Sequence, residues 1–341
     1  MGIKGLESLI LTNNDNDNNT NLSVVKKKLI FLKNKKVVID ISPYLYAGKK
    51  KNDIIGCMFN LITKLLKNNI YPLFVFDGNF SIEKEKEQER RKQQKNKAQI
   101  NNIVASELID EINSKIKGNQ INESIISKEI NDLKQFAEKC RVKSLKLDKG
   151  NILQVKKLLS LFGIPFIHLN LEADIVCASL VKCGIVDYCL SSDKDLLPFG
   201  CPNLVQLDFI KEDINIYNLN NILTNFKLSF EEFIDLCILL GSDYTPRIIG
   251  LKKEYALELI NKYKNLESIS NNISEISDDF ESKTGKYLRL PVNFNFEDTR
   301  KLFMTSYNKE FLLKHIGYID FKRIKNVLLR YETDFEPFEN M

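Results

Sequence analysis

The stretch KKVVIDI at residues 35–41 decides the fold class of this chain. Its β-branched apolar run predicts a buried strand, and YPLFVF at 71–76 and IVDYCL at 185–190 predict two more. Amphipathic helices are expected between and after these strands, at 53–67, 149–162, 171–182 and 230–240. Strands that alternate with helices at this spacing indicate an α/β fold with a largely parallel central sheet flanked by helices.

Two stretches do not follow this alternation. The polar tract at 13–21 predicts a loop. Residues 81–140 are charged and lack Pro, which predicts a helical segment that differs from the rest of the chain.

The composition excludes several classes of protein. The chain has 341 residues, 50 Lys and Arg against 45 Asp and Glu, and 43% hydrophobic residues, so it can bury a core and is not a disordered chain. It has no run of about 18 apolar residues that could span a membrane. Glu7 interrupts the apolar N-terminal stretch, which argues against a signal peptide. Seven Cys without a Cys-x-x-Cys pair, and only two His, predict reduced thiols in an intracellular protein and no zinc site.

Carboxylates follow each of the three predicted strands. Asp40 ends the first strand, Asp77 follows the second, and Asp193 lies just beyond the third. Because the carboxyl ends of parallel strands share one edge of a sheet, these side chains are expected to meet there. Each acid taken alone is more simply a turn residue or a helix cap. Four further acids lie near them in the sequence, namely Glu172, Asp174, Asp195 and Asp243.

Seven carboxylates at one edge would repel one another strongly, and bound divalent cations are the simplest way to offset that repulsion. An all-oxygen ligand set without His or Cys selects Mg²⁺, for which Mn²⁺ can substitute. Two such ions can activate a hydroxide and stabilise the leaving oxygen during phosphodiester hydrolysis. The pattern therefore predicts a two-metal site, and the simplest alternative is a structural α/β protein in which the acids coincide by chance.

Several motifs in a fixed order give the chain a resemblance to a known family. Over about residues 1–265 the motifs are MGIKGL, VVIDIS, FVFDG, LLSLFGIPF followed by LEAD, SSDKDLLPFG and LCILLGSDYTPRIIG. In this the chain resembles the structure-specific 5′ nucleases of the flap endonuclease family. The resemblance implies a single nuclease domain over 1–341 with a PIN-like 5′ nuclease fold. It also implies a helical arch or cap insertion at 80–148 and a helix–two-turn–helix DNA-binding element at 229–265.

The resemblance also implies an activity and a set of metal ligands. It implies a 5′ flap endonuclease and 5′–3′ exonuclease that acts on branched or flapped DNA in replication, repair or recombination. Two alternatives stay open: a related nuclease that prefers Holliday junctions, DNA ends or RNA, and a catalytically silent DNA-binding factor. Asp174 stands where eukaryotic members more usually have Glu. The implied metal ligands, of which Asp193 and Asp195 are also expected to be essential for catalysis, are Asp40, Asp77, Glu172, Asp174, Asp193, Asp195 and Asp243.

Other matching residues are expected to contact DNA. Lys84 and Arg91 match basic residues at the base of the family's arch, which contact the scissile phosphate and stabilise charge on its oxygens. Tyr46 matches an aromatic residue that stacks on a base, and core packing is the alternative for Tyr46 and for its neighbour Tyr44. Gly2 lies where the family's N-terminus approaches the active site.

The segment at 250–254 departs from the family pattern. It reads GLKKE where the family has Gly-hydrophobic-Gly-x-Lys, so Lys252 replaces the second Gly and Glu254 replaces the Lys. Gly250, Lys252 and Lys253 remain the expected contacts to duplex phosphates. The two departures argue against a K⁺ site at 241–254 like the one that the family usually has.

The sequence also indicates the setting in which the protein acts. No clamp-binding motif of the form Gln-x-x-hydrophobic-x-x-aromatic-aromatic occurs at the C-terminus. The protein is expected to be a monomer that binds DNA and no membrane. The missing motif and the bias toward Asn, Lys and Ile suggest a viral member. The expected location is the nucleus or, for a viral protein, a cytoplasmic replication site.

Overall fold

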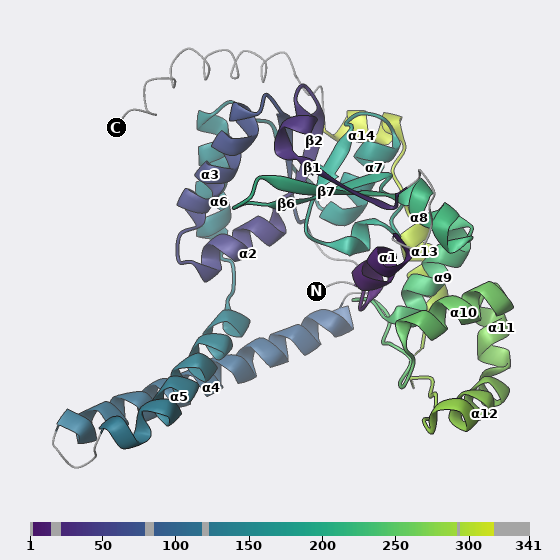
Figure 1. Cartoon of the computed structure of the whole chain (residues 1–341). Coiled ribbons are helices and arrows are strands. Elements are labelled where there is room, and N and C mark those ends of the chain that lie inside the picture. Colours follow the sequence, from purple (N-terminus) through teal and green to yellow (C-terminus); the bar gives the residue numbers. More distant parts are fainter. Residues whose placement is uncertain (1–2, 15–21, 79–84, 118–122, 292–293, 317–341) are drawn as a thin grey trace.

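The computed structural model describes residues 3–14, 22–78, 85–117, 123–291 and 294–316. Helices cover both faces of a central sheet, and a long helical hairpin extends away from it (Figure 1). A further group of helices from the C-terminal third of the chain lies beyond one end of the sheet. Among the described residues, no helix is long and apolar enough to cross a bilayer.

Within the described residues the sheet has seven strands, and this architecture confirms the α/β prediction. Its spatial order is β1-β7-β6-β5-β2-β3-β4, and the neighbours from β6 through to β4 are parallel, whereas β7 and β1 are antiparallel additions at one edge. The strands are β1 (Val24–Lys28), β2 (Lys36–Asp40), β3 (Tyr71–Phe76), β4 (Phe166–His168), β5 (Tyr188–Leu190), β6 (Asn203–Asp208) and β7 (Asp213–Asn218).

The central strand β2 alternates its side chains between two hydrophobic cores. Val37 and Ile39 face the core under α3 (Ile54–Lys67) and α6 (Lys149–Leu161). Val38 faces the opposite core, which α7 (Ala173–Lys182) and α9 (Phe230–Leu240) cover. Successive side chains of a strand point to opposite faces of the sheet. Because β2 is covered on both faces, its successive residues are apolar, and this produces the continuous apolar run in the sequence.

Two elements predicted from the sequence begin at a different residue in the structure. Asn13 belongs to α1 (Leu6–Asn14) rather than to a loop, because its side-chain amide donates a 2.9 Å hydrogen bond to the Leu9 carbonyl. Residues 15–21 of the same tract lie outside the described part of the chain. The third predicted strand begins at Tyr188 instead of residue 185. The backbone amides of Ile185 and Val186 both donate hydrogen bonds to the Leu180 carbonyl, so these two residues form the turn after α7 and do not belong to the strand.

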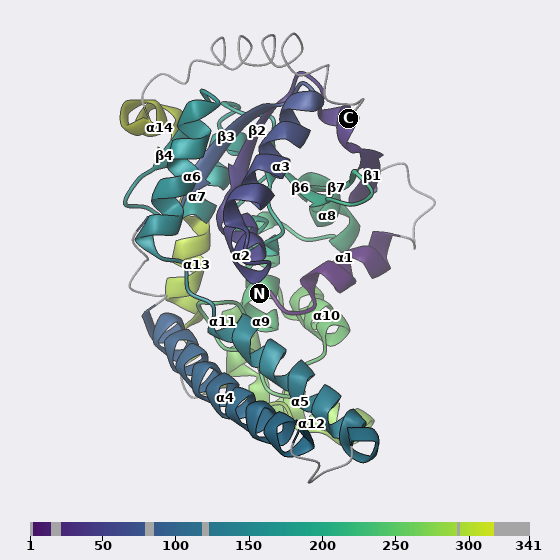
Figure 2. The same cartoon turned by 90° about the vertical axis from the view of Figure 1, so that its left-hand side faces the viewer.

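The helical hairpin consists of α4 (Glu85–Lys117) and α5 (Glu123–Ser144), which lie within the range expected for an arch insertion. Figures 1 and 2 show the two helices side by side over most of their length, projecting away from the sheet. Small residues let them approach closely, since Ala98 and Ala105 on α4 and Ala137 on α5 are buried. The opposite face of α4 stays exposed, so the hairpin is a thin projection rather than a second domain core.

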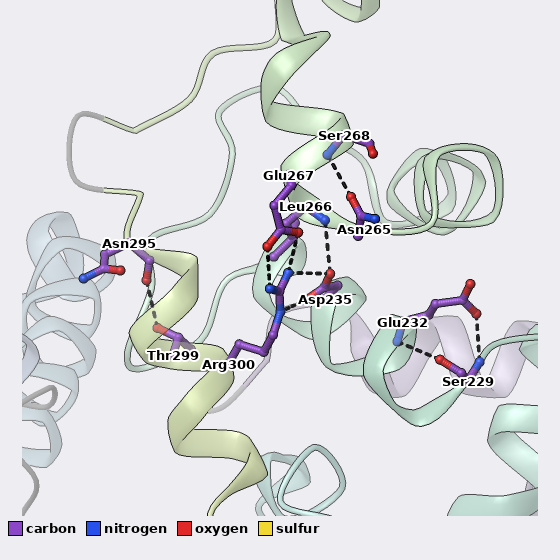
Figure 3. Close-up of polar contacts among 10 residues, drawn as sticks. All are labelled: Ser229, Glu232, Asp235, Asn265, Leu266, Glu267, Ser268, Asn295, Thr299 and Arg300. Carbon is purple, nitrogen blue, oxygen red and sulfur yellow. Dashed lines mark hydrogen bonds and ion pairs between the residues drawn. The ribbon is translucent and has the colours of Figure 1, made fainter.

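The segment in which a helix–two-turn–helix element is expected begins with α9 and ends with α10 (Lys253–Tyr263), and α11 (Leu266–Asn271) and α12 (Ile273–Thr284) follow. A capping box starts α9, because the Ser229 hydroxyl accepts from the Glu232 amide while the Glu232 carboxylate accepts from the Ser229 amide (Figure 3). The remaining helices are α2 (Ser42–Lys50), α8 (Leu219–Phe226), α13 (Phe296–Met304) and α14 (Lys309–Ile316).

Arg300 on α13 ties α9 and α11 together (Figure 3). Its guanidinium forms a bidentate ion pair with Asp235 on α9, at 2.7 and 2.8 Å, and a second one with Glu267 on α11. The Leu266 amide also donates to Asp235, at 3.1 Å. Asp235 is only 3% exposed, so this network fixes α9 from its buried side.

Candidate active site

Asp40 ends β2 and is buried at the carboxyl edge of the sheet. Its Oδ2 accepts a 2.8 Å hydrogen bond from the Ser191 hydroxyl, and its Oδ1 accepts a 3.2 Å bond from the Ser42 amide. Burial, followed by the charge of Asp77, raises the pKa of Asp40 from 3.8 to about 7. The ionised form of Asp40 is therefore costly unless a cation lies beside it.

Two serines join Asp40 to the neighbouring strand-end acids. The Ser42 hydroxyl donates to Asp77, which follows β3, while the Ser42 amide donates to Asp40. The Ser191 hydroxyl donates to Asp40 and accepts a 3.0 Å bond from the Asp193 amide. The structure thus brings the three strand-end aspartates together at one edge, where Asp77 and Asp193 are close enough to raise the Asp40 pKa.

A second group of acids surrounds the phenol of Tyr244. Glu172 occupies the N-cap position of α7, and its side chain accepts a 2.9 Å hydrogen bond from the Tyr244 hydroxyl instead of capping the helix. Asp174 lies in the first turn of the same helix. Burial and then the charges of Asp174 and Glu172 raise the pKa of Tyr244 well above its usual value. The charge of Asp195 adds to this effect, which places three of the predicted acids around one ring.

A short turn connects the two groups of acids. Asp193 begins the 3₁₀ turn η3 (Lys194–Leu196), and its Oδ1 accepts a 3.0 Å bond from the Asp195 amide. Asp195 is 2% exposed, and its Oδ1 accepts a 2.7 Å bond from the amide of Ile3. The N-terminal segment therefore reaches the acid cluster directly.

Asp243 joins the site from the loop after α9. Its Oδ2 lies 2.5 Å from Nη2 of Arg91, which stands on the first two turns of α4. Both side chains are partly buried. The base of the helical hairpin therefore meets the loop after α9, and the next residue of that loop, Tyr244, reaches Glu172.

The other predicted DNA contacts have different surroundings. Tyr44 packs edge-on against Phe209, as a core residue does. Tyr46 is 37% exposed, and the Lys95 ammonium of α4 lies over its ring and 3.3 Å from its hydroxyl. Gly2 and Lys84 lie outside the described residues.

The segment at 250–254 presents one of its two lysines to solvent. Lys252 is exposed at the start of α10. Lys253 instead donates a 2.7 Å hydrogen bond to the Ser8 hydroxyl of α1. Gly250 has a φ of +85°, and a Cβ at this position would lie 2.4 Å from the Tyr287 carbonyl oxygen, so only Gly fits the turn. Together with Lys286, residues 247–252 line a cavity of about 390 Å³.

The acids are a ligand set of the kind that hard cations prefer, but they do not form a closed metal cage. In the described parts of the chain, no three His, Cys, Asp or Glu side chains are grouped so that they could hold one ion. Carboxylates without a cation repel one another, and Mg²⁺ keeps several of its waters when it binds to protein. The all-oxygen donors and the raised Asp40 pKa fit a hydrated divalent cation.

Comparison with known proteins assigns the family. The XPG N-terminal domain matches residues 1–98, and the XPG I-region matches residues 163–243. Flap endonuclease 1 of Aedes aegypti is 31% identical over 326 residues, which cover 89% of this chain and 74% of that protein. The Caenorhabditis elegans protein is 33% identical over 296 residues, covering 81% and 69%. This chain belongs to the flap endonuclease family.

Solved structures support the same fold for this flap endonuclease family member. The catalytic core of Rad2 in complex with DNA substrate has a TM-score of 0.63 at 21% identity and covers 96% of this chain and 98% of that one. Human GEN1 in complex with Holliday junction DNA has a TM-score of 0.57 at 18% identity, with 97% and 78% coverage. The chain spans about 60% of the length of the Entamoeba dispar flap endonuclease 1, to which it is 34% identical over 261 residues.

Sequence reasoning missed the residues that hold the acids in place. Ser42, Ser191 and Tyr244 each donate a hydroxyl hydrogen bond to one of the predicted acids. Ser42 stands two residues after Asp40, and Ser191 two residues before Asp193. A hydroxyl at this spacing beside a strand-end Asp was therefore an available signal. Tyr244 follows Asp243, but its reach to Glu172 depends on the tertiary fold.

The raised pKa of Asp40 predicts how metal binding and pH together affect stability. The pKa of Asp40 in the folded protein, about 7, is higher than its ordinary value of 3.8. Protonated Asp40 therefore stabilises the metal-free fold at low pH, and this contribution is lost as the pH rises through 7. Excess Mg²⁺ should therefore raise the melting temperature more at about pH 8 than at about pH 6. Melting curves in EDTA and in Mg²⁺ would measure this, with Asp40→Asn as the control that loses the difference. An equal Mg²⁺ effect at both pH values would contradict it.

Proposed function

We propose that this protein is a divalent-metal-dependent, structure-specific DNA nuclease. Its activities would be 5′ flap endonuclease and 5′–3′ exonuclease on branched or flapped DNA in replication, repair or recombination. The products would carry a 5′-phosphate and a 3′-hydroxyl. The relatives named flap endonuclease 1 support this proposal at the level of the family, and the arrangement of the acidic edge supports it at the level of the site.

The observation that carries the proposal is the meeting of Arg91 with Asp243, the residue before the Tyr244 that donates to Glu172. A guanidinium beside clustered carboxylates supplies a cation where the phosphate of a substrate would have to enter. Arg91 is on the first turns of the hairpin, so it would exchange Asp243 for a phosphate oxygen when DNA arrives. The hairpin would then act as the arch that the sequence predicts at 80–148, with Lys84 as its second phosphate contact.

The acids would hold two Mg²⁺ ions, which Mn²⁺ could replace. Bound divalent ions would supply a nucleophilic hydroxide and stabilise the leaving oxygen. Ser42 and Ser191 orient Asp40 and Asp77 through the hydrogen bonds described above. Tyr244 holds Glu172 at the opposite group of acids. The ligands would be Asp40, Asp77, Glu172, Asp174, Asp193, Asp195 and Asp243.

The segment from α9 to α10 would bind duplex DNA beside the cut. Gly250 lets the backbone turn tightly there, and Lys252 adds an exposed cation. Lys253 would contribute mainly by holding α1 through Ser8. This division differs from the sequence expectation, in which both lysines contact phosphate.

Lys252 and Lys253 provide a matched pair of substitutions. Lys252→Ala is expected to weaken duplex binding and to lower the slope of log affinity against log salt by about 1, because one phosphate contact is lost. Lys253→Ala should leave that slope unchanged and lower the melting temperature instead. Fluorescence anisotropy at several salt concentrations, together with melting curves, would separate the two. Equal salt slopes for both variants would contradict the assignment.

The test of the function is cleavage of a matched set of substrates by purified protein in Mg²⁺. We expect cleavage of a 5′ flap near the branch point and stepwise degradation from nicks and gaps. A four-way junction and an RNA of the same sequence should be cut more slowly. Preferred cutting of the junction or the RNA would replace the flap assignment by one of the alternative nucleases. Binding without cleavage of any substrate would indicate the silent DNA-binding factor.

A further inference from the structure

Lys194 stands between the two aspartates of η3, yet its side chain points into the protein. It is 6% exposed, and its Nζ donates a 3.0 Å hydrogen bond to Oε1 of Gln206 on β6. The same ammonium lies 4.3 Å from the ring centre of Tyr217 on β7. A buried lysine at this position is costly unless its charge is compensated.

The compensating carboxylate comes from the N-terminal helix. Oε1 of Glu7 on α1 lies 3.5 Å from the Lys194 ammonium and accepts a 2.7 Å hydrogen bond from the Tyr217 hydroxyl. The same Tyr217 hydroxyl lies 3.2 Å from Oε1 of Gln206. Four side chains from α1, β6, β7 and η3 therefore form one polar network, in which Lys194 and Tyr217 are buried and the Glu7 side chain is 46% exposed.

A second contact joins the same two segments. The Ile3 amide, four residues before Glu7, donates its 2.7 Å hydrogen bond to Asp195. The N-terminal segment thus holds the η3 turn at two points, through the Ile3 amide at Asp195 and through Glu7 of α1 at Lys194. Because Asp193 also accepts from the Asp195 amide, a shift of Lys194 would move both carboxylates.

We propose that Lys194 and Glu7 are positioning residues that set the spacing of Asp193 and Asp195 for metal binding. This proposal rests on the proposed function, in which the two aspartates are metal ligands. Neither Lys194 nor Glu7 touches the metal or the substrate in this arrangement. Residues that orient metal ligands typically change metal affinity about 10- to 100-fold when they are replaced.

Electrostatics alone predicts the opposite change in Mg²⁺ affinity when Lys194 is removed. Lys194 is a cation near the acidic edge, so its removal would by itself strengthen the attraction for Mg²⁺. If its main role is to hold the η3 turn, its removal would weaken Mg²⁺ binding in spite of the lost repulsion. The direction of the change in affinity therefore distinguishes positioning from simple charge.

The experiment is a Mg²⁺ titration of the melting temperature of the full chain. Lys194→Met keeps the aliphatic stem and removes the ammonium. We expect it to raise the Mg²⁺ concentration for half of the stabilisation by about 10-fold. Glu7→Gln should shift it in the same direction, and the double variant should shift it no further than the larger single change, because both act through one network. The exposed Lys211 in the β6–β7 turn provides the control, and Lys211→Met should change nothing.

A further variant and the behaviour of the wild type separate the possible outcomes. If Lys194→Met does not fold, Tyr217→Phe removes only the hydroxyl that donates to Glu7, and it should raise the Mg²⁺ requirement in the same way. An unchanged or lowered Mg²⁺ requirement in the variants would overturn the positioning role. A wild type that Mg²⁺ does not stabilise would overturn the metal role and this proposal together. A wild type that Mg²⁺ stabilises but that cuts no DNA would overturn only the proposed function.

Discussion

Replacing Asp193 and Asp195 together by Asn is expected to reduce cleavage of flapped DNA by about 10⁴-fold, the scale at which loss of essential active-site groups slows an enzyme. Both side chains stand on η3, where Asp193 adjoins the Asp40 group and Asp195 adjoins the Tyr244 group. The double substitution therefore removes charge from both groups of acids at once. Asn keeps an oxygen in the position that accepts the Ile3 amide, so the fold should survive.

The measurement is a single-turnover rate on a 5′ flap in saturating Mg²⁺. Affinity for the same flap in the absence of divalent metal is the control, and it should stay within about threefold of the wild type, a small free-energy change. The melting temperature in EDTA should not fall, because two repelling charges are removed. Cleavage within tenfold of the wild type would show that these acids are not the catalytic centre.

Arg300→Ala is expected to lower the free energy of unfolding by about 3–5 kcal/mol, the usual cost of breaking a buried ion pair on one side. The cost arises mainly at Asp235, because the side chain of Asp235 is 4% exposed and that of Glu267 is 47% exposed. Burial raises the pKa of Asp235 even though Arg300 opposes the shift. Without Arg300 the buried carboxylate would have only the Leu266 amide as a described partner.

Urea denaturation of three variants would test this explanation. Glu267→Gln should cost less than about 1 kcal/mol, since an exposed ion pair contributes little. The double change Arg300→Met with Asp235→Leu should restore most of the stability that Arg300→Ala loses, because apolar side chains can replace a buried pair. A double variant as unstable as the single Arg300→Ala would contradict the buried-charge explanation.

The network around Arg300 also bears on the site, because it holds α9 in place (Figure 3). Asp235 is on α9, the helix that leads into Gly241 and Asp243. Loss of Arg300 would therefore loosen the element that carries one acid and the duplex-binding loop. Stability and duplex affinity should fall together in Arg300→Ala, whereas the Asp193 and Asp195 variant should lose neither.

Local sequence was sufficient for the strands β2 and β3 and for several helices, whereas β4 and β6 were not predicted and β5 begins later than predicted. β3 and α9 have the bounds that their apolar patterns predict, and β2 differs from its prediction by one residue at each end. These elements are covered on both faces, so their own residues carry the burial signal. The edge strand β1 and its partner β7 were not predicted. They pair antiparallel at the margin of the sheet, and the runs VVKKK and DINIYN show only part of an apolar pattern.

Contacts between distant residues were beyond the reach of the sequence pattern. The thiols of Cys177, Cys189 and Cys201 contact one another in the core, although no Cys-x-x-Cys spacing joins them. In the sequence, Lys194 looks like an ordinary charged residue of a polar turn. In the structure its side chain is buried and contacts Glu7 and Tyr217. Such contacts depend on how segments pack, and the packing of a long side chain does not follow from its neighbours in sequence.

The sequence by itself determined the α/β class, the family resemblance and the acids that follow the strands. It could do so because each of these aspartates ends its strand or lies at most three residues beyond it. Only the tertiary structure decided that Arg91 meets Asp243, that Lys253 holds α1 while Lys252 faces solvent, and that Ile3 reaches Asp195. Each of these depends on the relative placement of two elements, which the burial of apolar faces fixes for the whole molecule at once.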